Sequence, residues 1–341
     1  MSFKRFDTED IVISADSITA PAWSGDNVNL AAIYTKTQQT NGESGKYYYN
    51  LYNANPASVS TAAIQFSLAY GHVAGSGSIP LDSAVPGYSP SSIIYKQYRT
   101  LVNGTEEVNL QFGGFTSENI WVLAIERARF KEKLLPGSLT LAITSGSNTL
   151  TLTDNSNYAT TTTFSDAGRV FQLISGSAGV KNSSVNSDGH TAGSGSYGMF
   201  LPDAGLILLS GLALEDTVVN GGLAFATYEG VAADSNNLIQ MTACINNGGS
   251  GTFSLRSEET ISSNYVFVRA RNSEFNYSTN PSNITGSGEL RHSVMIDSPQ
   301  AYITSVGLYN DNNDLLAVAK LSRPLLKDFT KESLIRIKLD Y

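Results

Sequence analysis

The segment TAAIQFSLAY, residues 61–70, shows most clearly the pattern from which the fold follows. Its large apolar side chains occupy every second position: Ile64, Phe66, Leu68 and Tyr70. Polar or small side chains fill the positions between them. An alternation of period two is typical of a β-strand with one face on a core. We therefore expect a strand at residues 61–70.

The same alternation recurs along the chain. We expect further strands at residues 139–143, 149–153, 170–174, 206–209, 223–228, 265–271, 302–309, 315–319 and 334–340. Residues 139–143 and 149–153 flank Ser-Gly-Ser-Asn, and residues 302–309 and 315–319 flank Asp-Asn-Asn-Asp, so each pair predicts a hairpin. The last strand places Ile335, Ile337 and Leu339 on one face and is expected to close a sheet.

One segment has the pattern of a helix instead. Ser89 is a good N-cap, Pro90 suits the first helical position, and Asn103-Gly104 is a usual helix end. Apolar side chains recur at helical spacing between them. The predicted fold class is therefore mainly β (α+β), with antiparallel sheets and hairpins and one helix near residues 90–103.

The chain is long enough for several domains. We expect an N-terminal β-rich domain with the helix at residues 1–137 and a middle β domain with polar loops at residues 138–255. Residues 256–341 are expected to form a C-terminal hairpin segment that packs back on the first domain. The Gly-, Ser- and Asn-rich residues 175–196 are the best candidate for a mobile loop.

Composition restricts the class of protein. Only 15% of the 341 residues are charged and the formal net charge is −8, which argues against a nucleic-acid partner. The longest apolar stretch, residues 204–214, is too short to cross a bilayer, so we expect no membrane partner. The chain opens without a basic and apolar leader and has one cysteine, so synthesis in the cytoplasm is expected.

A short basic run stands out in this acidic sequence. Residues 119–133 are interpreted as a strand that runs from core to surface, with Arg127, Arg129 and Lys131 on one face and Lys133 continuing the run. Such a stripe is either a solvated face or a contact patch for acidic side chains on a neighbouring subunit. The same two interpretations hold for a second pair of cations. The predicted interface residues are Arg127, Arg129, Lys131, Lys133, Arg269 and Arg271.

No motif predicts a catalytic, cofactor-binding or metal-binding residue. The octapeptide at residues 71–78 recurs at 189–196 with seven of eight identical positions, which indicates two similar loops. His72 and His190 lie in these loops, where a shared metal site remains an alternative. Cys244 is expected to be a buried thiol, and residues 311–314 a polar hairpin turn rather than a calcium loop.

Several segments carry a resemblance to a known group of proteins. They are SPSSIIYKQYR (89–99), IERARFKEKLLPG (125–137), RNSEFNYSTNP (271–281), and YITSVGLYN (302–310) through AKLSRPLLK (319–327) to IRIKLDY (335–341). These resemble virion structural proteins of T-even-like contractile-tailed phages, especially those that infect marine cyanobacteria. The resemblance implies a component of the phage particle, in the tail baseplate or fibre-attachment periphery. It implies other virion proteins and further copies of the chain as partners.

Three other functions stay open. The first is a virion protein of the neck or capsid. The second is a carbohydrate-binding module that recognises a host surface glycan through exposed Tyr and Trp rings. The third is a polysaccharide depolymerase, which needs a pair of carboxylates in a cleft. Because no sequence feature selects such a pair, we expect a protein that is not an enzyme and binds no cofactor.

Overall fold

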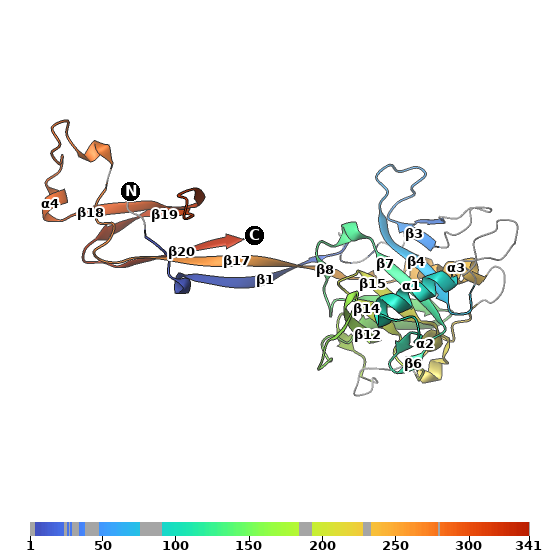
Figure 1. The fold of residues 1–341 in the computed structure, drawn as a ribbon. Coiled ribbons are helices and arrows are strands. Elements are labelled where there is room, and N and C mark those ends of the chain that lie inside the picture. The colour runs from blue at the N-terminus through green and yellow to red at the C-terminus, as the bar shows by residue number, and fades with distance from the viewer. Residues whose placement is uncertain are drawn as a thin grey trace. The chain divides into compact units, whose positions relative to one another are not determined.

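A computed structural model describes residues 4–23, 26, 28, 34–37, 48–75, 91–183, 193–227, 233–278 and 280–340. The chain forms two compact units (Figure 1). Unit 1 consists of Met1–Ser17 and Thr260–Tyr341, and unit 2 consists of Ile18–Glu259. Strands dominate both units, which confirms the mainly β fold class.

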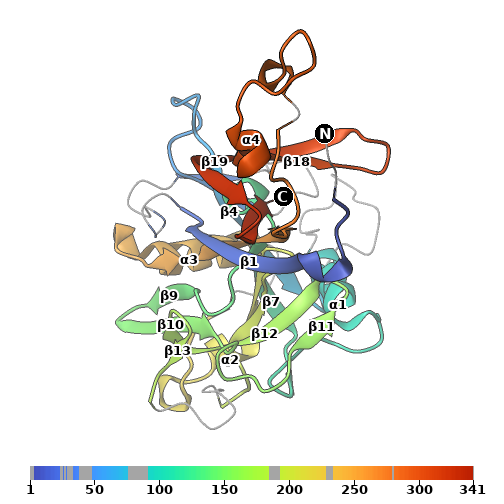
Figure 2. The ribbon, with the colours of Figure 1, turned by 90° about the vertical axis from the view of Figure 1, so that its left-hand side faces the viewer.

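Unit 2 is built on one large antiparallel sheet of order β16-β9-β10-β12-β14-β15-β7-β4-β3-β2. Its strands are β2 (Tyr34–Thr37), β3 (Tyr48–Tyr52), β4 (Ile64–His72), β7 (Asn119–Ile125), β9 (Thr140–Ser145), β10 (Asn148–Asp154), β12 (Gly168–Ser177), β14 (Gly198–Leu201), β15 (Leu206–Ser210) and β16 (Phe253–Ser254). Figure 2 shows β9, β10 and β12 side by side. Short strands β11 (Thr163–Ser165) and β13 (Val180–Lys181) pair with β12, and β5 (Gln111–Phe112) pairs with β6 (Phe115–Thr116).

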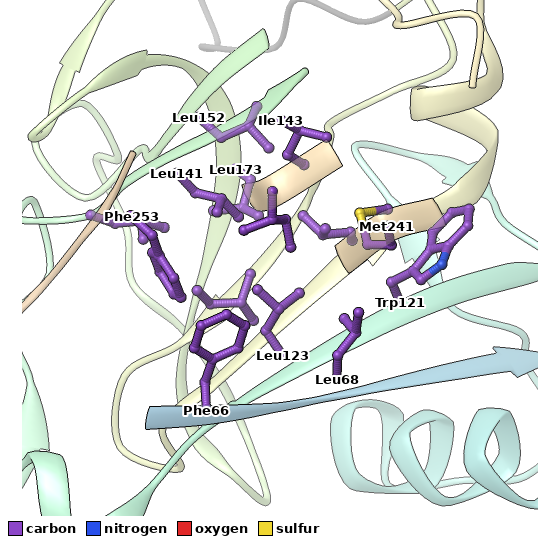
Figure 3. Close-up of a cluster of buried hydrophobic side chains, with 14 of the residues drawn as sticks. Phe66, Leu68, Trp121, Leu123, Leu141, Ile143, Leu152, Leu173, Met241 and Phe253 are labelled. Atoms are coloured by element: carbon purple, nitrogen blue, oxygen red, sulfur yellow. The ribbon is translucent and has the colours of Figure 1, made fainter. Parts of the chain in front are cut away.

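Both faces of this sheet are buried around β7. Trp121 and Leu123 belong to the larger buried cluster, which contains Met241 (Figure 3). Ile120 and Val122 point the other way, into a second cluster that includes Tyr95. Because neighbouring side chains on a strand point to opposite faces, a strand covered on both sides needs a continuous apolar run. The sequence Ile-Trp-Val-Leu of β7 meets that need.

Helices cover the two faces. Helix α1 (Ser91–Asn103) carries Tyr95, whose hydroxyl donates to the Ser117 carbonyl at 2.6 Å, and its presence confirms the predicted helix. The predicted cap, Ser89-Pro90, lies outside the described residues. Helix α3 (Ala233–Asn246), which we did not predict, adds Leu238 and Met241 to the larger cluster. Helix α2 (Gly211–Glu215) is short, and so is α4 (Val294–Asp297), which belongs to unit 1.

Unit 1 contains two small sheets. The sheet order β1-β17-β20 joins β1 (Ile11–Pro21), β17 (Arg256–Ala270) and β20 (Ser333–Asp340). The second sheet is the hairpin of β18 (Gln300–Tyr309) and β19 (Leu315–Asp328). The unit boundaries fall within β1 and β17. Among the described residues, the cluster that joins these strands has four buried apolar side chains: Val266, Leu308, Ile335 and Ile337.

Most predicted strands and both predicted hairpins are confirmed. The hairpin of β9 and β10 pairs Ser145 with Asn148 across Gly146, whose φ is +61°. The hairpin of β18 and β19 turns at residues 311–314, where the Asn310 side chain accepts hydrogen bonds from the Asn312 and Asp314 amides. The C-terminal strand β20 lies at an edge of its sheet, as expected.

The predicted strand at residues 223–228 is wrong. Residues 223–227 lie in irregular structure, and residue 228 is not described. Ala224 has a φ of +48°, and the amides of Leu223 and Phe225 both donate to the Leu214 carbonyl, at 3.0 and 3.1 Å. A left-handed residue reverses the local direction of the backbone and prevents a strand. In this irregular segment Phe225 packs against Trp121, with ring centroids 4.9 Å apart.

The two units differ from the three expected segments. Strand β7, from residues 1–137, pairs with β15, from residues 138–255, so these segments share one sheet. Unit 1 combines β1 with strands from residues 256–341. Such pairings join residues far apart in the chain, and local sequence patterns carry no information about them.

Candidate protein–protein interface

The predicted basic stripe does not exist as a strand face. Strand β7 ends at Ile125, and Arg127–Arg129 form a 3-10 turn named η3. The guanidinium of Arg127 donates to the Phe130 carbonyl at 2.6 Å and lies 4.5 Å from the centre of the Phe130 ring. Arg127 therefore closes this turn of its own chain. Our interpretation of residues 119–133 as one strand was wrong because the chain turns where the apolar run stops.

The two lysines that follow are matched with acids in the same unit. The Lys131 ammonium lies 2.7 Å from a Glu259 carboxylate oxygen, and the Lys133 ammonium lies 3.8 Å from both Glu132 and Glu258. Lys133 and Glu258 are direct partners in the pairing of β8 (Lys133–Leu134) with β17. The Lys131–Glu259 pair is exposed, and exposed ion pairs contribute little to stability. Their effect is to balance the positive charge that we expected to be presented to a partner.

The remaining predicted cations belong to unit 1. The Arg269 side chain is 60% exposed and lies 3.4 Å from Glu332, and the Arg271 amide donates to the Glu274 carboxylate at 2.9 Å. Lys4 also contacts Glu274, at 3.4 Å. The six predicted interface residues thus belong to two different units, and several of them form ion pairs with acids nearby. Their role in an interface stays a prediction.

A different feature marks unit 1 as a candidate interface. More than half of the exposed large apolar side chains among the described residues belong to unit 1, although it is much the smaller unit. Within the described residues, its cluster of buried apolar side chains has four members. Exposed apolar area on this scale is typical of surfaces that are covered in an assembly.

The outer side of the β18–β19 hairpin is one such surface. Leu316 and Val318 are 69% and 61% exposed, and they alternate with Ala317 and Ala319, which pack against the buried cluster. Tyr302 on β18 is 65% exposed. We call Tyr302, Leu316 and Val318 the hairpin face. Because side chains alternate along a strand, the hairpin face points away from the core of unit 1.

The excursion between β17 and β18, residues 271–299, is a second surface. None of its described residues is buried, and its exposed apolar side chains are Tyr277, Ile284, Leu290, Val294 and Ile296. A short 3-10 turn, Pro281–Asn283, and α4 are its helical parts. A long connection that orders apolar side chains without burying them is unusual in an isolated domain. It is the expected form of a segment that meets a partner.

The sequence carries a signal for the hairpin face that we did not use. Residues 315–321, LLAVAKL, are apolar at both alternating sets of positions until Lys320. A strand exposed on one face has a polar set, whereas a strand covered on both faces does not. The signal was overlooked because the strand was interpreted as half of an ordinary hairpin.

Unit 2 contains an open hollow of about 450 Å³ beside β9, β10 and β12. Its lining is uncharged and rich in hydroxyl groups, among them Thr140, Thr151 and Thr252. Thr140 and Ser177 hydrogen bond to each other at 3.0 Å. The lining has no ionisable side chain that could act as an acid or base on a substrate.

Within the described ranges, no three His, Cys, Asp or Glu side chains are placed to hold a metal ion together. His72 accepts a hydrogen bond from the Ala74 amide at 3.0 Å, and the second loop histidine, His190, lies outside the described residues. Cys244 is a buried free thiol, as predicted, and burial raises its pKa. A raised thiol pKa disfavours the nucleophilic thiolate.

Comparison with known proteins finds no matching family model, curated protein or solved structure. In the part of the chain that the structure describes, every helix is too short or too polar to cross a membrane. The candidate site is therefore defined by geometry alone: a small two-sheet unit with an apolar hairpin face and an unburied excursion.

Proposed function

We propose that this chain is a structural subunit of a phage virion, in the tail baseplate or its fibre-attachment periphery, and that it acts by protein–protein docking. Unit 1 is the docking part and unit 2 the stable body. The observation that carries the proposal is the apolar surface of unit 1, formed by the hairpin face and the excursion at residues 271–299. The resemblance to tail and baseplate proteins agrees with it.

The contrast between the two units supports this division of roles. Unit 2 buries aromatic side chains on both faces of its large sheet, which is sufficient for a stable domain. Unit 1 has a small core and leaves Leu316, Val318 and Ile296 more than 60% exposed. Interfaces between permanently associated subunits resemble a domain core that has been divided. A subunit of a particle gains stability when its neighbours cover such a surface.

The first test is the location of the protein. Particles of the phage that encodes the chain are purified and analysed by quantitative mass spectrometry and by electron microscopy with a label on this protein. We expect a constant number of copies per particle, placed at the tail end. Particles without the protein would refute the proposal. Label on the neck or capsid would refute the baseplate position.

A further inference from the structure

The first strand of unit 1 has apolar side chains that no part of the described structure covers. In β1, Ile11 is 43% exposed, Val12 48% and Ile13 73%. Neighbouring side chains on a strand point to opposite faces, so both faces of β1 are open here. None of the three belongs to a buried apolar cluster. The strand is therefore held by pairing with β17 and not by a core.

The backbone edge of β1 is also open. In the described sheet, β1 lies at the end of the order β1-β17-β20 and has β17 as its neighbour. Residues 11–17 read IVISADS, with Asp16 as their single charge and no proline. The opposite edge strand, β20, carries Arg336 and Lys338. Proteins usually protect edge strands with charges or proline; β20 is protected in this way, whereas β1 carries neither over residues 11–15.

The charge distribution favours another copy of this chain as the partner. Unit 1 contains eleven basic and twelve acidic residues, whereas unit 2 contains eleven basic and eighteen acidic residues. Nearly all of the net charge of −8 is therefore in unit 2. Two copies that approach through unit 1 meet little net repulsion, whereas contact through unit 2 opposes two acidic bodies.

We propose that two copies of this chain associate by antiparallel pairing of β1 with β1, centred on Ser14. In this register Ile13 lies opposite Ala15 of the other copy, Val12 opposite Asp16, and Ile11 opposite Ser17. No two like charges oppose each other, and the same patch serves both copies, as two-fold symmetry requires. The pairing gives hydrogen-bond partners to the backbone N–H and C=O groups on the open edge of β1, and it covers Ile11 and Ile13. It goes beyond the proposed function and does not depend on it.

The first experiment measures association of the purified full-length chain by sedimentation from about 1 to about 100 µM. The wild type is expected to rise from the monomer mass of 36.4 kDa towards twice that value. Ile13→Lys places a charge on the edge and is expected to raise the dissociation constant at least about tenfold. The control is Val219→Lys, because Val219 is the most exposed large apolar side chain among the described residues of unit 2, at 96%. This variant adds the same charge and should leave the dissociation constant unchanged.

The fold of both variants is checked by circular dichroism and by the urea midpoint. Ile13 is in no buried cluster, so Ile13→Lys should unfold at the midpoint of Val219→Lys. A wild type that stays monomeric over the whole range overturns the inference. So does a dissociation constant that is the same for both variants. Either result can occur while the protein is still found in particles, so the proposed function is tested separately.

The second experiment tests the register. Ser14→Cys places two thiols opposite each other at the centre of the pairing, within the Cα separation that a disulfide spans. Val219→Cys adds an equally accessible thiol to unit 2. Native Cys244 is buried and competes little. Under mild oxidation, Ser14→Cys is expected to form covalent dimers several times faster. Equal rates in the two variants would overturn the pairing through Ser14.

Discussion

The ammonium of Lys327 is completely buried and donates a hydrogen bond to the Asn276 side-chain carbonyl at 2.7 Å. The same ammonium donates to the backbone carbonyls of Asn272 and Asp328, at 3.1 and 2.7 Å. Lys327 lies on β19, whereas Asn272 and Asn276 lie at the start of the excursion. One buried cation therefore ties the excursion at residues 271–299 to the hairpin. A buried charge is stable only when it is well hydrogen bonded, as it is here.

Replacing this cation is expected to loosen the excursion. Lys327→Met keeps the length of the side chain but removes the ammonium donor from three carbonyl oxygens, of which that of Asn272 still accepts from the Asn276 side-chain amide at 2.7 Å, at a cost of about 1–3 kcal/mol. Unfolding in urea should show the loss of stability, and limited proteolysis should cut residues 271–299 faster. Lys320→Met is the matched control, because Lys320 is exposed on the same strand. Equal proteolysis of the two variants would show that Lys327 does not anchor the excursion.

A second prediction concerns a buried acid in unit 2. The Asp154 carboxylate is inaccessible and accepts hydrogen bonds from the Gly137 amide at 2.9 Å and the Ser156 amide at 3.2 Å. Burial raises the pKa of Asp154 above its usual value of 3.8, and these hydrogen bonds oppose the rise only in part. The folded state therefore holds the proton more tightly than the unfolded state. Its contribution to stability is present at low pH and is lost as pH rises through the folded-state pKa.

Asp154→Asn isolates this effect, because the amide does not titrate. The free energy of unfolding of the wild type, minus that of Asp154→Asn, should fall as pH rises from about 4. Urea titrations at a series of pH values measure the difference. A difference that grows with pH would mean that the hydrogen bonds, and not burial, dominate the pKa of Asp154.

Asp203 is expected to behave in the opposite way. Burial favours its neutral form, but the Arg169 side chain and amide donate to its carboxylate at 2.7 and 2.8 Å, and together these lower the pKa. Its stabilising effect is therefore present above the usual carboxyl range and is lost as pH falls. Comparison of the wild type with Asp203→Asn should show a stability difference that grows with pH. A flat difference would mean that the ion pair with Arg169 contributes nothing measurable.

The core of unit 2 allows a test with matched aromatic residues. Phe66 is completely buried and meets Phe253 edge to face, with ring centroids 5.1 Å apart. Phe66→Ala is expected to destabilise the protein by about 3–5 kcal/mol. Phe164, which is 71% exposed on β11, provides the control, and Phe164→Ala should change stability by less than about 0.5 kcal/mol. Similar unfolding midpoints for the two variants would contradict the arrangement of this core.

Local patterns predicted local structure well. The hairpins of β9–β10 and β18–β19 were found because strand alternation and turn residues lie within a few positions of each other. Helix α1 was found from its apolar spacing and its end at Asn103-Gly104. Helix α3 was missed because its buried Leu238 and Met241 stand among Ser, Asn and Thr residues that are weak helix formers.

The candidate interface was harder to predict. The cations of residues 127–133 were predicted to form an interface because charge is rare in this sequence. In the structure, Arg127 packs on the Phe130 ring and Lys131 forms an ion pair with Glu259. These partners depend on a turn and on a strand pairing that join distant residues. The hairpin face was visible in the sequence as apolar residues on both faces of β19. Which of those faces is open depends on the packing of unit 1.

The central claim is that unit 1 docks into a virus particle, and one measurement tests it most directly. A phage that lacks the gene for this chain is grown in cells that produce the wild-type protein, Leu316→Asp or Val219→Asp, one in each experiment. The amount of this protein in purified particles is then measured by mass spectrometry. Leu316 is 69% exposed on the hairpin face, and Val219 is 96% exposed in unit 2. We predict wild-type incorporation for Val219→Asp and at least about tenfold less for Leu316→Asp, since burying one unpaired carboxylate costs more than 1.4 kcal/mol. Equal incorporation of the two soluble, folded variants, or particles that assemble without the protein, would contradict the account.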